Sequence, residues 1–332
     1  MLDENRFSDD GMRHLRDLTN LEFLSLVDTD VTNRCCEHFR KLNWLERLRV
    51  PFEFDDQALD DLRETKLFPL LSRSHEVTDA GDLILGNQTS LKHLLLDGKR
   101  IKDRTLKILP KLQSLEGLSL RASLVSDQGL RNVFDCRNLR FLDLSRTRIT
   151  DEGLVHLAEL QKLEIVRLVE TRIDGSGLRH LGNCTQLSAI FLSDTNMMDS
   201  AIRHLSGMSN LEYVDLHATQ IEGAGLIHLA NCFRLSKVDL SDTNVGDDAL
   251  ANIALIARLR NLNLRGTKIT NVGLSYLANH FFLEHLDLTS TNIDDDGLRH
   301  LSAMPALKVV IISDTNATSN ADKILNSCRV FR

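Results

Sequence analysis

Residues 139–162 read LRFLDLSRTRITDEGLVHLAELQK, and the same pattern begins again at Leu163. Carried through the chain, this register gives thirteen blocks, nearly all at that same interval, and every block starts with Leu. The fourth residue of each block is Leu, Val or Ile, and the sixth is apolar in every block except one. Self-similarity at a fixed period predicts a repeat architecture. The block starts are Leu21, Leu45, Leu67, Leu91, Leu115, Leu139, Leu163, Leu187, Leu211, Leu235, Leu259, Leu283 and Leu307.

Each block combines two hydrophobic periods. Its first half, LxxLxL, alternates apolar and polar residues, which predicts a short strand with one buried face. Its second half begins with a Thr-Asp pair such as Thr150 and Asp151, either of which can cap a helix. Leu154 and Leu157 follow with i, i+3 spacing and therefore share one face of about two helical turns. One block cannot bury its own leucines, so we expect stacked blocks to bury them.

The spacing of the two elements predicts curvature. Parallel strands stack about 4.8 Å apart, whereas packed helices lie roughly 8–10 Å apart. The strands are therefore expected on the inside of an arc, with the helices on the outside. The sequence predicts an α/β solenoid with a parallel sheet on its concave face and short helices on its convex face.

The repeat LxxLxLxxTxITDxGLxxLxxLxx resembles the leucine-rich-repeat family over residues 7–330. This resemblance implies the right-handed α/β horseshoe of that family. Cys at the twenty-second place of some blocks, in phrases such as LGNC and LANC, is similar to the cysteine-containing subclass. That subclass includes the substrate-binding halves of F-box proteins and many bacterial repeat proteins. The residues concerned are Cys136, Cys184, Cys232 and Cys328.

The ninth place of the block departs from the family, in which Asn or Cys is common there. Thr occupies this place in nine blocks, and its hydroxyl can bond to the backbone of the turn, so we predict a structural threonine ladder. A 24-residue period with Thr is more typical of bacterial than of eukaryotic repeats. The residues are Thr29, Thr147, Thr171, Thr195, Thr219, Thr243, Thr267, Thr291 and Thr315.

We expect residues 1–332 to form a single solenoid. Residues 1–20 contain only the second half of a block and are predicted to cap the first strand. Residues 21–306 hold about twelve repeats, irregular at 45–90, and residues 307–332 form an atypical repeat or cap. Atypical terminal repeats are expected in solenoids because they shield the core.

The irregular stretch contains one shortened block with Pro51, Phe52 and Phe54, followed by Pro69 and Ser72. Proline removes a donor from a strand ladder, so the sheet is predicted to be distorted between about residues 50 and 75. Two interpretations remain open, namely ordinary drift of the repeat near one end and a protruding aromatic loop that touches a partner.

Composition narrows the class of partner. A net charge of −7 argues against nucleic acid, which needs clustered Lys and Arg. No apolar run is long enough to span a bilayer. The first residues, MLDENRFSDD, lack the basic-then-apolar layout of a signal peptide. We therefore expect a cytoplasmic protein that binds neither nucleic acid nor membrane.

No motif indicates a cofactor, a metal or a catalytic centre. Seven His residues occupy the eighteenth place of their blocks, one per helix, too far apart for ligands that must lie about 2 Å from one zinc ion. Cys136, Cys184 and Cys232 lie two blocks apart, beyond the roughly 7 Å Cα limit for a disulfide, and are expected to be buried and reduced. GxSxG, GxxxxGK and HExxH sequences are absent. The sequence therefore predicts no cofactor, no metal and no enzymatic activity.

The candidate site lies on the concave face. The third, fifth, seventh and eighth residues of each block are predicted to point outward, and in the middle blocks they form an aromatic and apolar stripe that changes from basic to acidic neighbours. Such patches commonly mark interfaces, and aromatics with Arg are typical anchors, although half-exposed aromatics also suit strands for structural reasons. The candidate contacts are Phe141, Arg146, Ile165, Arg167, Phe191, Tyr213, Asp215 and Asp239.

The leading hypothesis is a non-enzymatic scaffold that binds a protein or peptide on its concave face. One alternative is the substrate-recognition part of a larger assembly, such as a ubiquitin-ligase adaptor or a bacterial effector, which the resemblance suggests. A remote alternative is a hydrolase in the irregular stretch 50–82, whose only conceivable members are His75 and Asp79.

Overall fold

The computed structural model describes residues 6–332 except 43, 46, 50–54, 63–88, 90 and 100. The chain divides into two compact units, Met1–Arg148 and Ile149–Arg332, which we describe one at a time. Pro51, Phe52, Phe54, Pro69, Ser72 and the hydrolase candidates His75 and Asp79 lie outside the described residues.

In the N-terminal unit, the paired strands come from successive blocks and run parallel. Strand β1 pairs with β2, with Phe23 opposite Arg47, and β4 pairs with both β3 and β5. The strands are β1 (Phe23–Ser25), β2 (Arg47–Arg49), β3 (His93–Leu95), β4 (Gly117–Ser119) and β5 (Phe141–Asp143). The helices are η1 (Asp9–Leu15), η2 (Asn33–Phe39), α1 (Asp56–Leu62), η4 (Thr105–Lys111), α3 (Asp127–Leu130) and η5 (Arg131–Val133), where η denotes a 3-10 helix.

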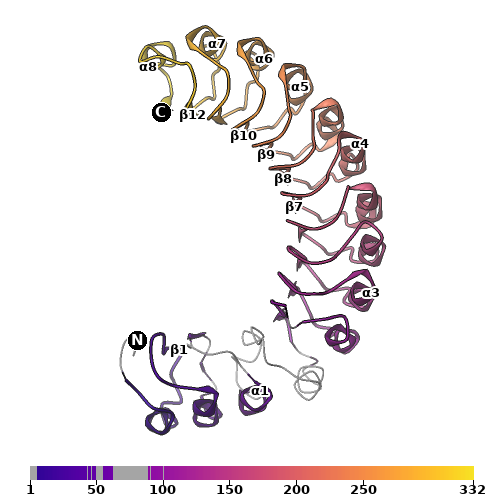
Figure 1. Ribbon diagram of the computed structural model, residues 1–332, viewed down its shortest axis with the longest axis vertical. Coiled ribbons are helices and arrows are strands. Elements are labelled where there is room, and N and C mark those ends of the chain that lie inside the picture. The colour runs from indigo at the N-terminus through magenta and orange to yellow at the C-terminus, as the bar shows by residue number, and fades with distance from the viewer. Residues whose placement is uncertain are drawn as a thin grey trace. The chain divides into compact units, whose positions relative to one another are not determined.

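In the C-terminal unit, β6 to β13 form a parallel sheet in sequence order, with the strands on the inner side of each turn and the helices on the outer side (Figure 1). The strands are β6 (Ile165–Arg167), β7 (Ala189–Phe191), β8 (Tyr213–Asp215), β9 (Lys237–Asp239), β10 (Asn261–Asn263), β11 (His285–Asp287), β12 (Val309–Ile311) and β13 (Arg329–Phe331). The helices are η6 (Gly153–Leu157), η7 (Ser176–Asn183), α4 (Asp199–Ile202), η8 (Arg203–Leu205), η9 (Ala224–Asn231), α5 (Asp247–Ile253), α6 (Asn271–Leu277), α7 (Asp295–Arg299) and α8 (Ala321–Ile324).

Among the described residues, the leucines of the repeat form the core of each unit. In the block that begins at Leu211, the side chains of Leu211, Val214 and Leu216 from the strand are fully buried, and so are Leu226 and Leu229 from the helix. Full burial of one such side chain contributes about 1.5–3 kcal/mol. The predicted leucine-rich-repeat solenoid, with its parallel sheet and short helices, is confirmed.

The threonine ladder is also confirmed. In all nine blocks the ninth-place hydroxyl donates to the backbone carbonyl three residues earlier, at 2.6–2.7 Å. Thr219, for example, donates to Leu216 and is only 2% exposed. The residue before each Thr adopts a left-handed backbone in these blocks, as at Arg146 and Asp242, so the hydroxyl holds a tight turn closed.

Helix capping runs between blocks, which the repeat pattern alone does not predict. The Asp at the thirteenth place accepts backbone N–H bonds from the following block rather than mainly from its own. Asp199 accepts from Glu222, Gly223 and Gly225 at 2.7–2.9 Å. A Cβ at Gly225 would clash with the backbone carbonyl of Asp199, so glycine permits this close approach. Equivalent backbone N–H bonds are accepted by Asp9, Asp103, Asp151, Asp247 and Asp295.

The helices are less regular than predicted. The sequence suggested about two α-helical turns in each block, whereas the structure has short α and 3-10 segments, as at η5 and η7. At the C-terminal end, β13 pairs with β12, with Arg329 opposite Val309, although no block start predicted a strand there. The step from Val309 to Arg329 is shorter than the regular step from His285 to Val309, so the regular interval does not reveal this strand.

Three of the twenty-second-place cysteines are buried and unpaired, as predicted. Each thiol of Cys136, Cys184 and Cys232 donates to a carbonyl of the preceding block, at 3.3–3.6 Å. Burial raises the pKa of the Cys184 and Cys232 thiols to about 11, and burial with the nearby Asp135 raises that of Cys136 to about 12. Cys328 is only partly buried and bonds within its own block.

One part of the predicted outward face is wrong. The seventh-place residues Ser145, Ser193, Ser241 and Thr289 are buried, and so is the fifth-place Asp143. Where the fifth place is Asp, its carboxylate accepts the backbone N–H two residues later, which draws both residues into the turn. Asp143 accepts from Ser145 at 2.9 Å, and Asp239 accepts from Ser241 at 2.9 Å.

Candidate interaction surface

The third-place and fifth-place side chains of β6 to β12 line the face of the sheet that does not carry the helices, which we call the open face. Four of them form a continuous row. The Arg167 guanidinium lies over the Phe191 ring at 4.8 Å, and Phe191 meets Tyr213 edge to face with ring centroids 5.1 Å apart. The Lys237 Nζ lies 4.3 Å from the centroid of the Tyr213 ring. We call Arg167, Phe191, Tyr213 and Lys237 the cation–π row.

The cation–π row is held in place by repeat geometry. Its members come from β6, β7, β8 and β9, which pair in exact register, so that Tyr213 stands opposite Lys237. Burial raises the pKa of the Tyr213 phenol above its ordinary value of 10.0, and the Asp215 and Asp239 carboxylates add to the effect. Tyr213 therefore remains a neutral hydrogen-bond donor at physiological pH.

The acidic candidates next to the row have internal partners. Asp215 accepts from the Ser193 hydroxyl at 2.6 Å and from the His217 backbone N–H at 3.1 Å. Asp239 accepts from the Ser241 hydroxyl at 2.6 Å and from the Asn263 side-chain amide at 3.0 Å. These bonds fix the carboxylates in the turns and in neighbouring strands, so the two groups have defined positions on the open face.

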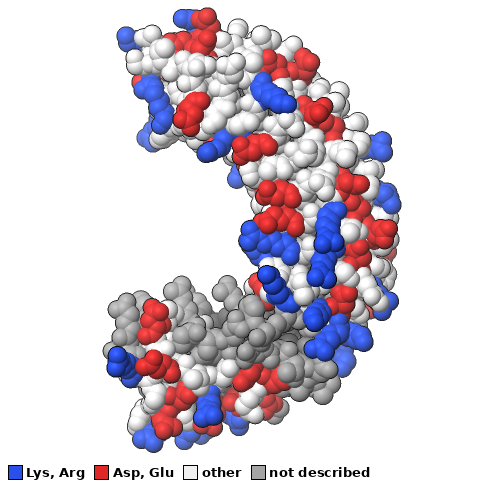
Figure 2. Space-filling view, viewed as in Figure 1, with Lys and Arg blue, Asp and Glu red and all other residues white. Residues whose placement is uncertain are grey.

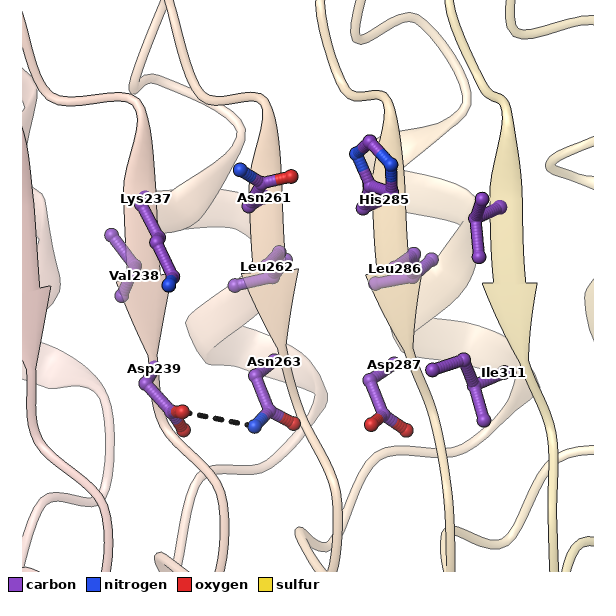
Figure 3. Close-up of a pocket in the computed structure, with 11 residues that line it drawn as sticks. Lys237, Val238, Asp239, Asn261, Leu262, Asn263, His285, Leu286, Asp287 and Ile311 are labelled. Carbon is purple, nitrogen blue, oxygen red and sulfur yellow. Dashed lines mark hydrogen bonds between the residues drawn. The ribbon is translucent and has the colours of Figure 1, made fainter. Parts of the chain in front are cut away.

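A shallow groove of about 260 Å³ continues from the row across β9 to β12. Figure 3 shows Lys237, Asn261 and His285 side by side at one level and Asp239, Asn263, Asp287 and Ile311 at the next, with the Asp239–Asn263 bond between two of them. The apolar Val309 and Ile311 close its far end. The groove thus offers donors, carboxylates and an apolar wall on rigid strands.

The structure brings some predicted contacts together and separates others. Arg167, Phe191 and Tyr213 touch one another, and Asp215 and Asp239 follow on β8 and β9. Ile165 is half-buried on β6, opposite Ala189. Phe141 and Arg146 belong to the N-terminal unit. There Phe141 is half-buried opposite Gly117, and Arg146 is exposed in the left-handed turn after β5.

Sequence reasoning missed Lys237, Asn261, Asn263, His285 and Ile311. All of them occupy the third or fifth place of their blocks, the places from which Phe191 and Tyr213 were identified. Following those two places through to the last block would have found them. Asn261 and Asn263 were not predicted, because a neutral amide is a weaker sign of an interface than an aromatic or charged side chain.

Among the described residues, no three His, Cys, Asp or Glu side chains are grouped so that they could hold a metal ion. Within the same residues, no helix is both long and apolar enough to cross a membrane. His204, in the row of eighteenth-place histidines, has its pKa lowered by burial and by the neighbouring Arg203 and Arg179.

Comparisons with known proteins agree with the fold. A family described as "Leucine Rich repeat" matches residues 135–158, 259–278 and 279–302. No curated protein sequence matches the chain. An internalin (inlF) from Listeria monocytogenes is similar in structure, with a TM-score of 0.66 and 19% identity over 100% of this chain and 85% of that one.

Two further solved structures are similar at a lower level. The plant peptide hormone receptor RGFR1, solved in complex with RGF2, gives a TM-score of 0.52 with 15% identity over 96% of this chain and 64% of the receptor chain. An internalin C2 (inlC2) from Listeria monocytogenes gives 0.51 with 19% identity over 72% of this chain and 91% of that one. At these identities the likeness concerns the fold.

The periodic leucines, the stacked parallel strands and the matched repeats together define the class. The described part of the chain has the leucine-rich-repeat fold, with leucine-rich repeats matched at residues 135–158, 259–278 and 279–302 and a buried cysteine at the twenty-second place of three blocks.

Proposed function

We propose that this protein is a non-enzymatic scaffold that binds a protein or peptide on the open face of β6 to β12. The observation that carries the proposal is the cation–π row continuing into the groove. Together they place rings, cations, amides and carboxylates at successive strands of one rigid sheet. Sites on strands hold their geometry better than sites on loops, and Tyr and Arg are frequent interface anchors.

The dimensions favour an elongated partner. Six strand steps from β6 to β12 span about 29 Å at about 4.8 Å per step. An extended segment covers that distance with about nine residues at roughly 3.3 Å each. A small molecule would contact only part of it. In support, the structurally similar receptor RGFR1 was solved in complex with RGF2.

We propose that residues 1–332 form one solenoid, because the regular step from Leu139 to Leu163 passes through the boundary between the two units without a break. We also propose a cytoplasmic location. The support is that Cys35, Cys36, Cys136, Cys184, Cys232 and Cys328 are all unpaired, which suits a reducing compartment.

The test is affinity capture from the source organism with three baits: the wild type, Phe191→Ala/Tyr213→Ala, and Val272→Ala/Tyr276→Ala. The last pair is a matched control on α6, with Val272 61% and Tyr276 44% exposed. We expect the wild type and the control to retain the same partner and the row variant to lose it. Circular dichroism checks that each bait is folded. If the folded row variant retains every partner, the open face is not the binding surface.

A further inference from the structure

The edge of the sheet at which the strands begin carries a second concentration of binding chemistry. A cavity of about 590 Å³ lies there, lined by Glu212, Arg234, Ser236, Arg258, Arg260 and Phe282. All of these residues stand at the twenty-fourth or second place of their blocks, outside the open face. We call it the rim cavity, and it shares no lining residue with the groove on the open face.

Charge accumulates at the rim cavity against the trend of the protein. Arg234 and Arg258 hold the same place in adjacent blocks, whose backbones are hydrogen bonded here from Ser236 to Glu212 at 3.0 Å. Neither arginine has an ion pair or a ring contact with any described residue. Like charges that line one cavity repel each other, and the chain as a whole carries −7. Fold stability therefore gives no reason to place these arginines together.

The third arginine of the cavity is positioned by its neighbours. Arg260 pairs with Glu284, which also pairs with Lys308 at 2.5 Å. These two cations lower the pKa of the Glu284 carboxyl group, so it stays charged. One carboxylate thus serves two cations, which leaves Glu212 as the remaining acid facing Arg234 and Arg258 in the cavity. Positive charge remains in excess.

Exposed rings lie in the cavity lining and directly before it in the sequence, since Phe233 precedes Arg234 and Phe281 precedes Phe282. Phe233 is 72% exposed and Phe281 is 69% exposed, the two highest values among the large apolar side chains that the structure describes. Phe282 lines the cavity itself and is 50% exposed, and Leu255 is 54% exposed in the intervening loop. Aromatic rings beside arginines are typical of interface centres. In Figure 2 both signs of charge are interspersed over the visible surface of this unit.

We infer that the rim cavity binds an acidic protein segment that also carries an aromatic or aliphatic side chain. Carboxylates of such a segment pair with the guanidinium groups of Arg234 and Arg258, which match carboxylate geometry well. Its apolar side chain packs on Phe282, with Phe233 and Phe281 at the margins. A purely inorganic anion would leave the rings uncovered, and an uncharged apolar segment would leave the arginines unpaired.

The test is fluorescence anisotropy at low ionic strength with a labelled peptide of sequence Glu-Phe-Glu-Glu-Phe-Glu. The comparison peptide has Gln in place of every Glu. We expect the acidic peptide to bind wild type at least about tenfold more tightly than the Gln peptide. Arg234→Glu/Arg258→Glu should weaken the acidic peptide at least about tenfold, and added salt should weaken it in the wild type.

A matched variant distinguishes the effect of charge in the cavity from the effect of the protein's net charge. Arg172→Glu/Arg203→Glu makes the same change in net charge at two exposed residues that do not line the cavity. It should bind the acidic peptide like the wild type, and so should Phe191→Ala/Tyr213→Ala, which removes only the rings of the open face. Phe282→Ala should weaken the peptide while leaving the salt dependence unchanged. If charge reversal prevents folding, Arg234→Gln/Arg258→Gln replaces it.

The inference is wrong if the rim variant and the Arg172/Arg203 variant bind the acidic peptide equally, or if the Glu and Gln peptides bind the wild type equally. Inorganic pyrophosphate that competes as effectively as the unlabelled peptide would indicate a general anion site instead. Tighter binding of a labelled oligothymidylate than of the acidic peptide would indicate a nucleic-acid surface instead.

Discussion

The cation–π row and the rim cavity are built on the same blocks, yet their side chains are used in opposite ways. In the row, Arg167 and Lys237 lie over rings, and the neighbouring carboxylates bond to turns. At the rim, Arg234 and Arg258 have no such contact with the described residues, and the rings near them face solvent. A group whose partners are internal contributes to the fold, whereas a group without them is available to a ligand. The difference implies that the row contributes to stability through contacts that Arg234 and Arg258 of the rim do not make among the described residues.

The largest loss of stability is expected from a substitution in the core beneath both surfaces. Leu240→Ala removes a fully buried side chain directly after β9, the strand that begins at Lys237 of the row and follows Ser236 of the rim. We expect a loss of about 2–5 kcal/mol, because the cavity left behind cannot close completely. Urea unfolding followed by circular dichroism measures it. Leu255→Ala, in the same block but 54% exposed, is the control and should cost far less.

Substitutions in the two surfaces should change the free energy of unfolding by smaller and unequal amounts. Phe191→Leu removes the ring that contacts both Arg167 and Tyr213 and should cost about 1 kcal/mol. Arg258→Gln at the rim should change stability by less than about 0.5 kcal/mol, because Arg258 has no ion pair or ring contact with any residue that the structure describes. The same urea titration compares them. Equal losses would mean that the row and the rim do not differ in structural role.

The smallest expected effect is the pH dependence of stability that arises from Tyr213 in the cation–π row. Because the pKa of Tyr213 is raised in the fold, the folded state keeps the phenol proton at pH values at which the unfolded chain has released it. This contribution is complete below about pH 10 and is lost as pH rises above it. Unfolding midpoints of the wild type should therefore fall above about pH 10 more steeply than those of Tyr213→Phe. Parallel curves for the two proteins would contradict a buried phenol.

Much of this fold could be predicted because each block contains two independent signals, the leucines of the strand and the threonine of the turn. The LxxLxL leucines predicted the strands, and the ninth-place threonines predicted the ladder that Thr219 and its equivalents form. The candidate rings Phe191 and Tyr213 were identified for the same reason, since a fixed register places equal positions side by side. The outward position predicted for Asp143 is wrong, because its bond to the Ser145 N–H depends on a turn conformation that no pattern of hydrophobicity expresses.

The features that escaped prediction depend on contacts between blocks. Asp151 was expected to cap the helix of its own block, although its carboxylate oxygens accept from the backbone N–H groups of Asp174 and Gly177 in the next block. The rim cavity was missed because Arg234 and Arg258 stand at the end of the repeat, where the pattern carries no apolar constraint and side chains look interchangeable. A residue's role there becomes visible only when adjacent blocks are placed beside each other.

Capping across blocks has a consequence for how such a chain can change in length. Asp151, Asp199 and Asp247 each reach forward by nearly one whole block to the first backbone donor they satisfy, at Asp174, Glu222 and Thr270. Duplicating or deleting one whole block brings an equivalent donor to the same acceptor, so the bond is re-formed with a different neighbour. An insertion of any other size moves the backbone donor away from the Asp carboxylate, so the hydrogen bond is lost. Duplication of one whole block can therefore lengthen the protein while every helix keeps its capping hydrogen bonds.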